Sequence, residues 1–367
     1  MRIFSLICLS LLIALSITVS PLRAQISLET GGYLQTWHIF DQTTELSDGS
    51  EISTYGFRLR RARLTARGRI NEHFSATTWL DFASGTNPLL DFHMDAHVRP
   101  WLNFRAGQFI MPGQSFDTAR LVSSRLFFYE RPGVTTALAS GMGYDAFRDI
   151  GVMAYGTYGR LWYGIHAGNG AGRFTQAGTN ITQRSAGSGL YGARVDYEII
   201  DGLTLGAHVS TNQQRDVVQA GSDPFDIDRT SWSLRLHTNN LGVDRLYSQF
   251  EYMRMDVNDT NRGVITDADD AYDLHGFYGE IGYGITREWH VLGRYDQIVQ
   301  KPGQSGFFAG ESRFNRDSIT LGVTRYVFHE NREIARAYLN YNLGTSSPGD
   351  LNNHAVVLVL QLRFIPI

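Results

Sequence analysis

Residues 90–99, Leu-Asp-Phe-His-Met-Asp-Ala-His-Val-Arg, decide the fold class of this chain. From Leu90 to Val98 every second residue is apolar, and each residue between them is charged or a histidine. A period of two is typical of a β-strand, whose successive side chains point to opposite faces of the sheet. One face is wholly polar and the other wholly apolar, which is the pattern of a wall between water and lipid.

The same alternation returns along the whole chain. Its connections are short and long in turn: Asn71-Glu72 is a tight turn, whereas residues 41–54 and 169–188 are long. Outer-membrane barrels have short periplasmic turns and long extracellular loops at opposite ends, and a soluble β-sandwich does not sort its connections in this way. The sequence therefore predicts an all-β fold, a transmembrane antiparallel β-barrel of about 16 strands. The predicted strands are 32–40, 55–70, 74–82, 90–99, 102–109, 148–155, 161–168, 189–199, 203–212, 228–238, 245–256, 273–285, 288–298, 314–325, 335–344 and 354–364.

Residues 1–24 have the pattern of a secretory signal peptide. A positively charged start precedes an apolar run over 3–19 and the small residue Ala24. We expect cleavage after Ala24, which leaves 25–367 as one β-barrel domain in the outer membrane of a Gram-negative bacterium. An uncleaved membrane anchor is the alternative, and the turn-forming Pro21 disfavours it.

Composition agrees with an exported barrel. The chain has 38 glycines, 21 phenylalanines and 18 tyrosines, and its one cysteine, Cys8, lies in the signal segment. Mean hydropathy is only −0.21, because only every second residue of a barrel strand needs to be apolar. Removal of the signal segment takes away two arginines, so the formal net charge moves from −3 to −5. Lys301 is the only lysine, and 32 of the 33 basic residues are therefore arginine.

Residues 112–147 form the longest connection, between two predicted strands. A connection of this length is usually functional or disordered, and large apolar residues such as Phe116, Leu126, Phe127, Phe128 and Tyr129 argue against disorder. We interpret it as the third extracellular loop, folded inward so that its arginines narrow and charge the passage. Taken alone, the segment is equally compatible with a loop packed outward or with a small lid.

The predicted strand 55–70 has a face that is almost entirely arginine. Its alternation slips at Arg60-Arg61, which a β-bulge would explain. Lipid excludes each charge at several kcal/mol, so this face must point into the lumen. The arginines of the strand are Arg58, Arg60, Arg61, Arg63, Arg67 and Arg69.

Three motifs resemble the phosphate-selective porin O and P family: residues 57–64 (Phe-Arg-Leu-Arg-Arg-Ala-Arg-Leu), 105–109 (Arg-Ala-Gly-Gln-Phe) and 148–153 (Arg-Asp-Ile-Gly-Val-Met). Arg125 and Glu130-Arg131 add to the resemblance. It implies a sixteen-stranded, homotrimeric outer-membrane channel with an inward third loop and a ladder of arginines along the path.

This chain departs from the family pattern in two ways. The family's strongest phosphate selectivity comes with a lysine cluster, which a chain with Lys301 alone does not have. Many such barrels end on an aromatic residue, whereas Phe364 is followed by three more residues. Arginine-based anion passage remains the expectation, with phosphate and polyphosphate as candidate solutes.

The expected function is passive diffusion of small anions through an arginine-lined constriction. A guanidinium keeps its charge at physiological pH, and its planar fork suits phosphate and carboxylate. For each arginine the alternative role is a wall-anchoring salt bridge, with Asp81, Asp91, Asp95, Asp117 or Glu130 as partners. The candidate permeation and anion-binding residues are Arg58, Arg60, Arg61, Arg63, Arg67, Arg105, Arg120, Arg125 and Arg131.

Other classes of function have weaker support. His93, Asp95 and His97 share one face of a strand, but neighbours two apart lie about 6.5–7 Å apart, which is loose for one metal ion. We therefore expect no metal and no cofactor. We also expect no catalytic residue, since a nucleophile signature such as Gly-x-Ser-x-Gly is absent. The remaining alternatives are a general or weakly selective porin and a structural barrel with a plugged lumen. Expected partners are small inorganic anions, outer-membrane lipid and lipopolysaccharide, and two further copies of the chain; no nucleic acid is expected.

Overall fold

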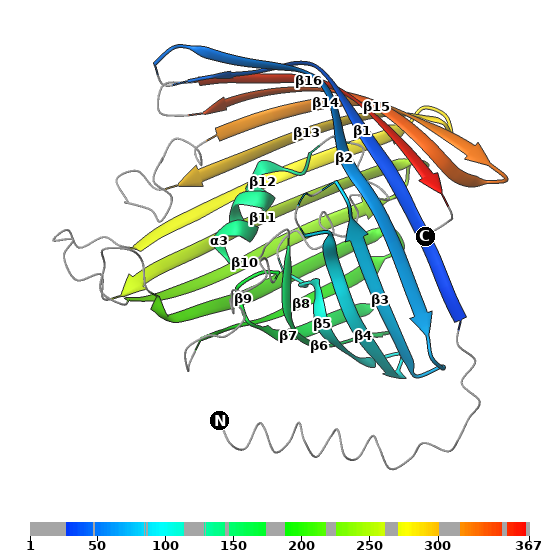
Figure 1. Cartoon of the computed structure of the whole chain (residues 1–367), viewed down its shortest axis with the longest axis vertical. Helices are drawn as coiled ribbons and strands as arrows, with labels where there is room; N and C mark the ends of the chain where they lie inside the picture. Colours follow the sequence, from blue (N-terminus) through cyan, green and yellow to red (C-terminus); the bar gives the residue numbers. More distant parts are fainter. Residues whose placement is uncertain are drawn as a thin grey trace.

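Sixteen strands close into one antiparallel barrel over the residues that the computed structural model describes (Figure 1). Each strand pairs with the next along the chain, and the first pairs with the last, which confirms the predicted fold class. The described residues are 27–46, 48–83, 85, 87–113, 128, 130–143, 147–173, 188–217, 225–260, 271–300, 316–346 and 351–364. The elements are β1 (Ser27–Glu45), β2 (Glu51–Arg69), β3 (Phe74–Asp81), β4 (Leu89–Arg99), β5 (Leu102–Ile110), α3 (Gly133–Gly141), β6 (Arg148–Tyr158), β7 (Leu161–Gly168), β8 (Gly189–Ile200), β9 (Leu203–Val217), β10 (Phe225–Asn239), β11 (Leu246–Thr260), β12 (Ala271–Gly284), β13 (Trp289–Gln300), β14 (Arg316–His329), β15 (Arg332–Ser346) and β16 (Leu351–Phe364).

The two faces of the wall follow the sequence alternation. On β4 the apolar Phe92 and Met94 are exposed on the outside, whereas Asp91, His93 and Asp95 are buried on the inside. The outer face of the barrel is therefore an apolar belt, and the polar side chains line the interior. Among the described residues, no helix has the length and apolarity needed to cross a membrane.

The first hairpin is longer than the sequence alternation predicts. Residues 41–54 are predicted as a polar loop, but β1 continues to Glu45 and β2 begins at Glu51. The prediction was wrong because a strand pair needs an apolar face only where it meets lipid. Here the strands are held by polar contacts instead, such as the 2.8 Å hydrogen bond between the hydroxyls of Thr43 and Ser53.

The predicted β-bulge in β2 is confirmed by the pairing register. Gln35 of β1 pairs with Arg61, and the next residue, Thr36, pairs with Leu59. Arg60 is therefore the extra residue, and it lets arginines on both sides of the bulge face the interior.

Strand length divides the barrel wall into two parts. The consecutive strands β3–β7, which we call the low wall, have 8, 11, 9, 11 and 8 residues. β1 and β2 have 19 residues each and extend well past the end of β3 (Figure 1). The long segment 112–147 begins and ends in this low wall, since it joins β5 to β6.

The helix α3 lies inside the barrel (Figure 1). Val134 and Leu138 of the helix join one buried apolar cluster with Met253 and Met255 of β11 and Leu274 of β12. The described residues of α3 therefore lie inside the barrel and pack on the inner side of β11–β13, which we call the helix-facing wall.

Candidate functional site

The inner face of β2 concentrates positive charge. We call its five predicted site residues, Arg58, Arg60, Arg61, Arg63 and Arg67, the arginine wall. Arg58 and Arg67 are exposed, Arg60 is half-buried, and Arg61 and Arg63 are buried. The guanidinium carbons of Arg58 and Arg60 lie 5.5 and 5.2 Å from the ring centroid of Trp37, which faces inward from β1. Trp37 thus holds two cations on the lumen side of the bulge by cation–π contact.

Few carboxylates balance the arginine wall. Arg63 donates from Nε to Asp81 Oδ2 at 2.9 Å, and Arg61 donates to the amide oxygen of Gln35, a neutral partner. Among the described residues, no carboxylate lies within ion-pair distance of Arg58 or Arg67. The face therefore keeps a net positive charge.

The neighbouring arginines of the low wall are anchored by acids. Arg105 on β5 donates from Nε to Asp95 Oδ1 at 2.7 Å, and Asp95 also accepts from the Tyr155 hydroxyl at 3.0 Å. Arg148 makes a two-pronged contact with Asp91, with both bonds at 2.9 Å. These pairs match the wall-anchoring alternative, so they fix strand positions more than they attract solutes.

The sequence motif around His93 gives no metal site in the described part of the chain. His93 Nδ1 lies 3.1 Å from Asp95 Oδ2, but Asp95 is already occupied by Arg105. No group of three or more histidine, cysteine, aspartate or glutamate side chains is close enough to hold a metal ion in the described residues.

Glu130 connects the inward segment to both sides of the lumen. Its carboxylate Oε1 lies 3.3 Å from Arg60 Nη2 of the arginine wall. Its backbone carbonyl accepts a 2.8 Å hydrogen bond from Arg294 Nη1 of β13. The segment is therefore held between β2 and β13, and one acidic side chain partly screens Arg60.

Arg131 follows directly and adds to the positive region. Its guanidinium lies 4.4 Å from the ring centroid of Phe147. Removal from bulk water, and then the positive charges of Arg61, Arg63 and Arg148, lower the pKa of Arg131 well below its usual value. The lowered pKa records how closely positive charges gather around Arg131. The other two predicted loop residues, Arg120 and Arg125, lie outside the described residues.

The local sequence explains where α3 begins and ends. Pro132 precedes the helix, and the Gly133 N–H donates to Asp296 Oδ1 of β13 at 3.0 Å. A side chain at Gly133 would meet the Arg316 guanidinium, which would have to move aside. After the last turn Gly143 adopts φ +84°, the left-handed conformation that commonly ends a helix.

The sequence did carry a signal for this helix. Val134, Leu138 and Met142 recur at intervals of four, which places them on one face of a helix, and all three are fully buried. Strand alternation dominates the rest of the chain, and it hides a nine-residue helix from a search based on a period of two.

The helix-facing wall also carries an arginine, in a different setting. Arg294 of β13 lies 3.6 Å from Glu280 and 3.8 Å from Asp296, and all three side chains are buried. Its guanidinium also lies 4.6 Å from the ring centroid of Phe128. This arginine is matched by acids and anchors the inward segment, so it is not an open anion site.

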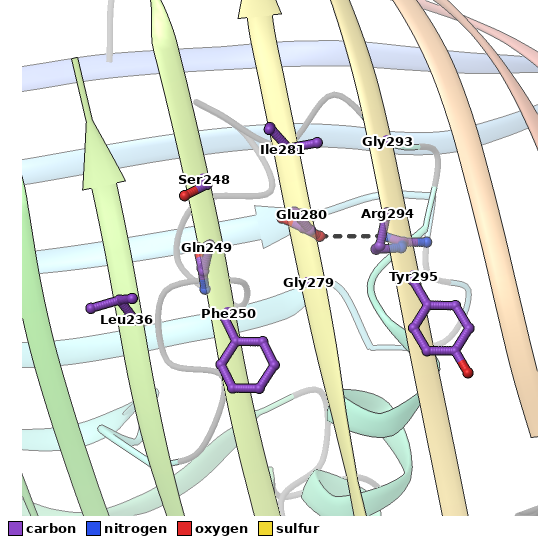
Figure 2. Close-up of a pocket in the computed structure, with 10 residues that line it drawn as sticks. All are labelled: Leu236, Ser248, Gln249, Phe250, Gly279, Glu280, Ile281, Gly293, Arg294 and Tyr295. Atoms are coloured by element: carbon purple, nitrogen blue, oxygen red, sulfur yellow. Dashed lines mark ion pairs between the residues drawn. The ribbon is translucent and has the colours of Figure 1, made fainter. Parts of the chain in front are cut away.

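A hollow of about 400 Å³ lies in the wall formed by β10–β13. Figure 2 shows the rings of Phe250 and Tyr295 beside it, with the Glu280–Arg294 ion pair behind the strands. Phe250, Ile281 and Tyr295 are exposed on the outer face of the barrel. The hollow therefore opens toward lipid and is not part of the passage.

Comparison with known proteins agrees with this geometry. The family model described as phosphate-selective porin O and P matches residues 33–364. A search of curated proteins found no match.

Solved outer-membrane proteins share the fold. A loop L8 deletion mutant of OmpT from Vibrio cholerae is 15% identical with a TM-score of 0.63, covering 92% of this chain and 99% of that chain. OmpT of Vibrio cholerae in a trimer form is 14% identical with a TM-score of 0.61, covering 92% and 99%. The outer membrane channel DcaP of Acinetobacter baumannii is 11% identical with a TM-score of 0.59, covering 94% and 100%.

Proposed function

The chain belongs to the phosphate-selective porin O and P family, and on that premise we propose that this outer-membrane porin passes small anions by passive diffusion. Phosphate and polyphosphate are the candidate solutes. The family assignment points to a channel rather than an enzyme.

One observation carries the proposal: the arginine wall has five guanidinium groups on one strand and two carboxylate partners, Asp81 and Glu130, among the described residues. In a barrel of this width the lumen is aqueous, and charges near the narrowest point decide which ions pass. Fixed guanidinium groups raise the local concentration of anions and lower that of cations.

The inward segment completes the proposed constriction. We assign that role to residues 112–147, because Glu130 and α3 cross the interior between the arginine wall and the helix-facing wall. Arg120, Arg125 and Arg131 would extend the positive path along the segment. Residues 1–24 are proposed to act as the export signal, and the mature barrel as a homotrimer, as one similar structure is.

Phosphate preference is the finer part of the proposal. The single lysine removes the cluster that the family resemblance associates with the strongest phosphate binding. Arg63 and Arg105 are each paired with an aspartate, which favours weaker, more general anion passage. A weakly selective anion porin is therefore the second candidate.

A planar-bilayer recording separates these functions. Purified protein is inserted in symmetric KCl, and phosphate is added while the chloride current is measured. A current that falls and saturates with phosphate supports a phosphate site on the path. Anion preference without this block supports the general anion porin, and no conductance at all supports a plugged barrel.

A further inference from the structure

The hollow on the outer face of β10–β13 has two glycines as its floor (Figure 2). In the strand register each glycine lies between two large, exposed side chains: Gly279 between Phe250 and Tyr295, and Gly293 between Ile281 and Leu321. Neighbouring strands lie about 4.8 Å apart, so each glycine leaves a gap about 10 Å wide between the side chains on either side of it.

Packing within the protein does not require these two glycines. On the same strand as Gly279, Gly282 faces inward, where a side chain would collide with the ring of Tyr247. At Gly279 and Gly293, by contrast, the nearest atoms to an added Cβ lie 3.9 and 3.8 Å away, which is an ordinary contact distance. A glycine inside a strand usually marks a bulge or a close approach of another group, and the register of β12 and β13 is continuous here. The open space is therefore the feature to explain.

Aromatic rings form one rim of the hollow and keep it open. The ring centroid of Phe277 lies 5.7 Å from that of Phe250 and 5.6 Å from that of Tyr295. The Tyr295 hydroxyl donates to Asp317 Oδ1 at 2.8 Å, which fixes the direction of its ring. The three rings therefore support one another beside Gly279.

The surroundings of the hollow suit hydrocarbon better than water. Its volume is about 400 Å³, and the charged Glu280 and Arg294 are buried behind the strands (Figure 2). Ser248 at its rim already shares a 2.9 Å hydrogen bond with the hydroxyl of Thr238, so a water molecule would gain little there. An empty hollow would forfeit the dispersion contacts of its walls. A groove between fixed rings and aliphatic side chains fits one extended acyl chain.

A cation lies below the hollow, at the end of the barrel that has the short turns. β13 pairs with β14 through Trp289 and Arg325, and four residues further along through Gly293 and Leu321. That separation is about 13 Å of strand, or about 9 Å across the membrane at a tilt of about 45°. The Arg325 guanidinium lies 5.4 Å from the ring centroid of Trp289, and tryptophan is typical of the membrane surface. Arg325 is exposed, and no carboxylate in the described part of the chain lies within ion-pair distance of it.

The other end of the hollow faces a carboxylate instead. Asp317 of β14 accepts a 2.8 Å hydrogen bond from Gln297 Nε2 of β13. Arg254 lies further out on β11, but its guanidinium is already paired with Asp256 at 2.8 Å. A phosphate that approaches from this end would meet a negative charge, whereas one that approaches from the short-turn end would meet Arg325.

From these features we propose that the hollow and Arg325 form a binding site for one phospholipid of the periplasmic leaflet. The phosphate lies against the Arg325 guanidinium, and one acyl chain runs past Val291 into the hollow at Gly293. Short turns mark the periplasmic end of an outer-membrane barrel, which assigns the lipid to that leaflet. The rise of about 9 Å is less than half of an apolar belt of about 25 Å, so the chain reaches Gly293 without crossing the midplane.

Native mass spectrometry of the purified barrel tests this site. The probe is dipalmitoyl phosphatidylglycerol, and dipalmitoylglycerol, which lacks the phosphate, is the matched lipid control. One variant combines Gly279→Leu with Gly293→Leu and fills the hollow; a second, Arg325→Gln, removes the cation. The matched control variants are Ala207→Leu on β9 and Arg160→Gln, which lies in an exposed ion pair. The shift on a gel between heated and unheated samples checks that each variant is folded.

The expected result is one bound phosphatidylglycerol per chain in the wild type and in both control variants, with binding weaker by about tenfold or more in the two site variants. Equal affinities of all variants, or equal binding of the lipid without phosphate, would overturn the proposal. If the filled variant does not fold, Arg325→Gln alone decides.

A parallel titration with lipopolysaccharide separates the two leaflets. We expect it to leave the bound phosphatidylglycerol in place. Displacement of that phospholipid would overturn the proposal, because the hollow would then belong to a lipid of the outer leaflet. The hollow lies outside the passage, so none of these results depends on ion selectivity.

Discussion

The arginine wall and the helix-facing wall line the same lumen, but they use arginine in opposite ways. On β13, Arg294 is buried between Glu280 and Asp296 and holds the backbone of the inward segment. On β2, Arg58 and Arg67 are exposed to the lumen and have no carboxylate partner among the described residues. The role of an arginine in this barrel therefore depends on whether carboxylates lie beside it and on how deeply its side chain is buried. A buried, paired arginine holds the structure together, whereas an exposed, unpaired one can interact with passing ions.

The two walls also differ in what covers them. The helix-facing wall has an apolar patch on its inner side, where Met253, Met255 and Leu274 pack in one buried cluster with α3. The arginine wall cannot bury a helix without desolvating several charges, which would cost several kcal/mol for each. The inward segment therefore packs on the apolar patch and leaves Arg58 and Arg67 exposed.

The largest effect is expected from Arg294→Gln. The substitution leaves two buried carboxylates without their cation, and breaking a buried pair in this way costs about 3–5 kcal/mol. The temperature at which the folded barrel converts to the unfolded form on a gel should fall clearly. Arg325→Gln is the control, since Arg325 is exposed and stacks on Trp289; its effect should be small. Equal losses of thermal stability in the two variants would contradict the structural role assigned to Arg294.

Leu138→Ala is expected to loosen the inward segment. Truncating a fully buried leucine costs about 2–5 kcal/mol, and the loss falls on the contact between α3 and the helix-facing wall. Single-channel conductance should rise and become noisier as the segment detaches. Thr136→Ala, at an exposed position of the same helix, should leave conductance unchanged. An unchanged conductance for Leu138→Ala would mean that α3 does not limit the passage.

Replacing Arg58, Arg60 and Arg67 together by glutamine is expected to weaken anion preference. Each cation interacts with a passing anion by about 1 kcal/mol at 4 Å in water, or about fivefold in permeability ratio. The triple variant should lose most of the selectivity while keeping its thermal stability. Arg160→Gln, in an exposed pair with Asp201, is the matched control. Retained selectivity in the triple variant would locate the filter elsewhere.

Glu130→Gln should have the smallest effect, and in the opposite direction. The Arg60–Glu130 pair is partly exposed, so its loss costs only about 0.2–1 kcal/mol of stability. Arg60 then faces the lumen without a counter-charge, and anion preference should rise by up to about fivefold, the ratio that 1 kcal/mol gives. The Glu130 backbone bond to Arg294 does not need the side chain, so conductance should stay near the wild-type value. A fall in anion preference would contradict this role.

Strand alternation predicted the barrel wall well because one face of each strand meets lipid and the other meets the aqueous lumen. Successive residues therefore alternate between apolar and polar. The bulge at Arg60 and the acidic partners Asp81, Asp91 and Asp95 also follow from local sequence. The strand content of residues 41–54 could not be predicted in this way, because above the lipid both faces are polar. The early end of the pairing between β2 and β3 could not be predicted either, because it depends on where the neighbouring strand ends.

The most direct test of the central claim is the reversal potential of the wild-type channel in a KCl gradient. If the arginine wall controls the passage, the reversal potential lies on the chloride side, so chloride is more permeant than potassium. A reversal potential on the potassium side would contradict the account, because the acidic residues would then control the path.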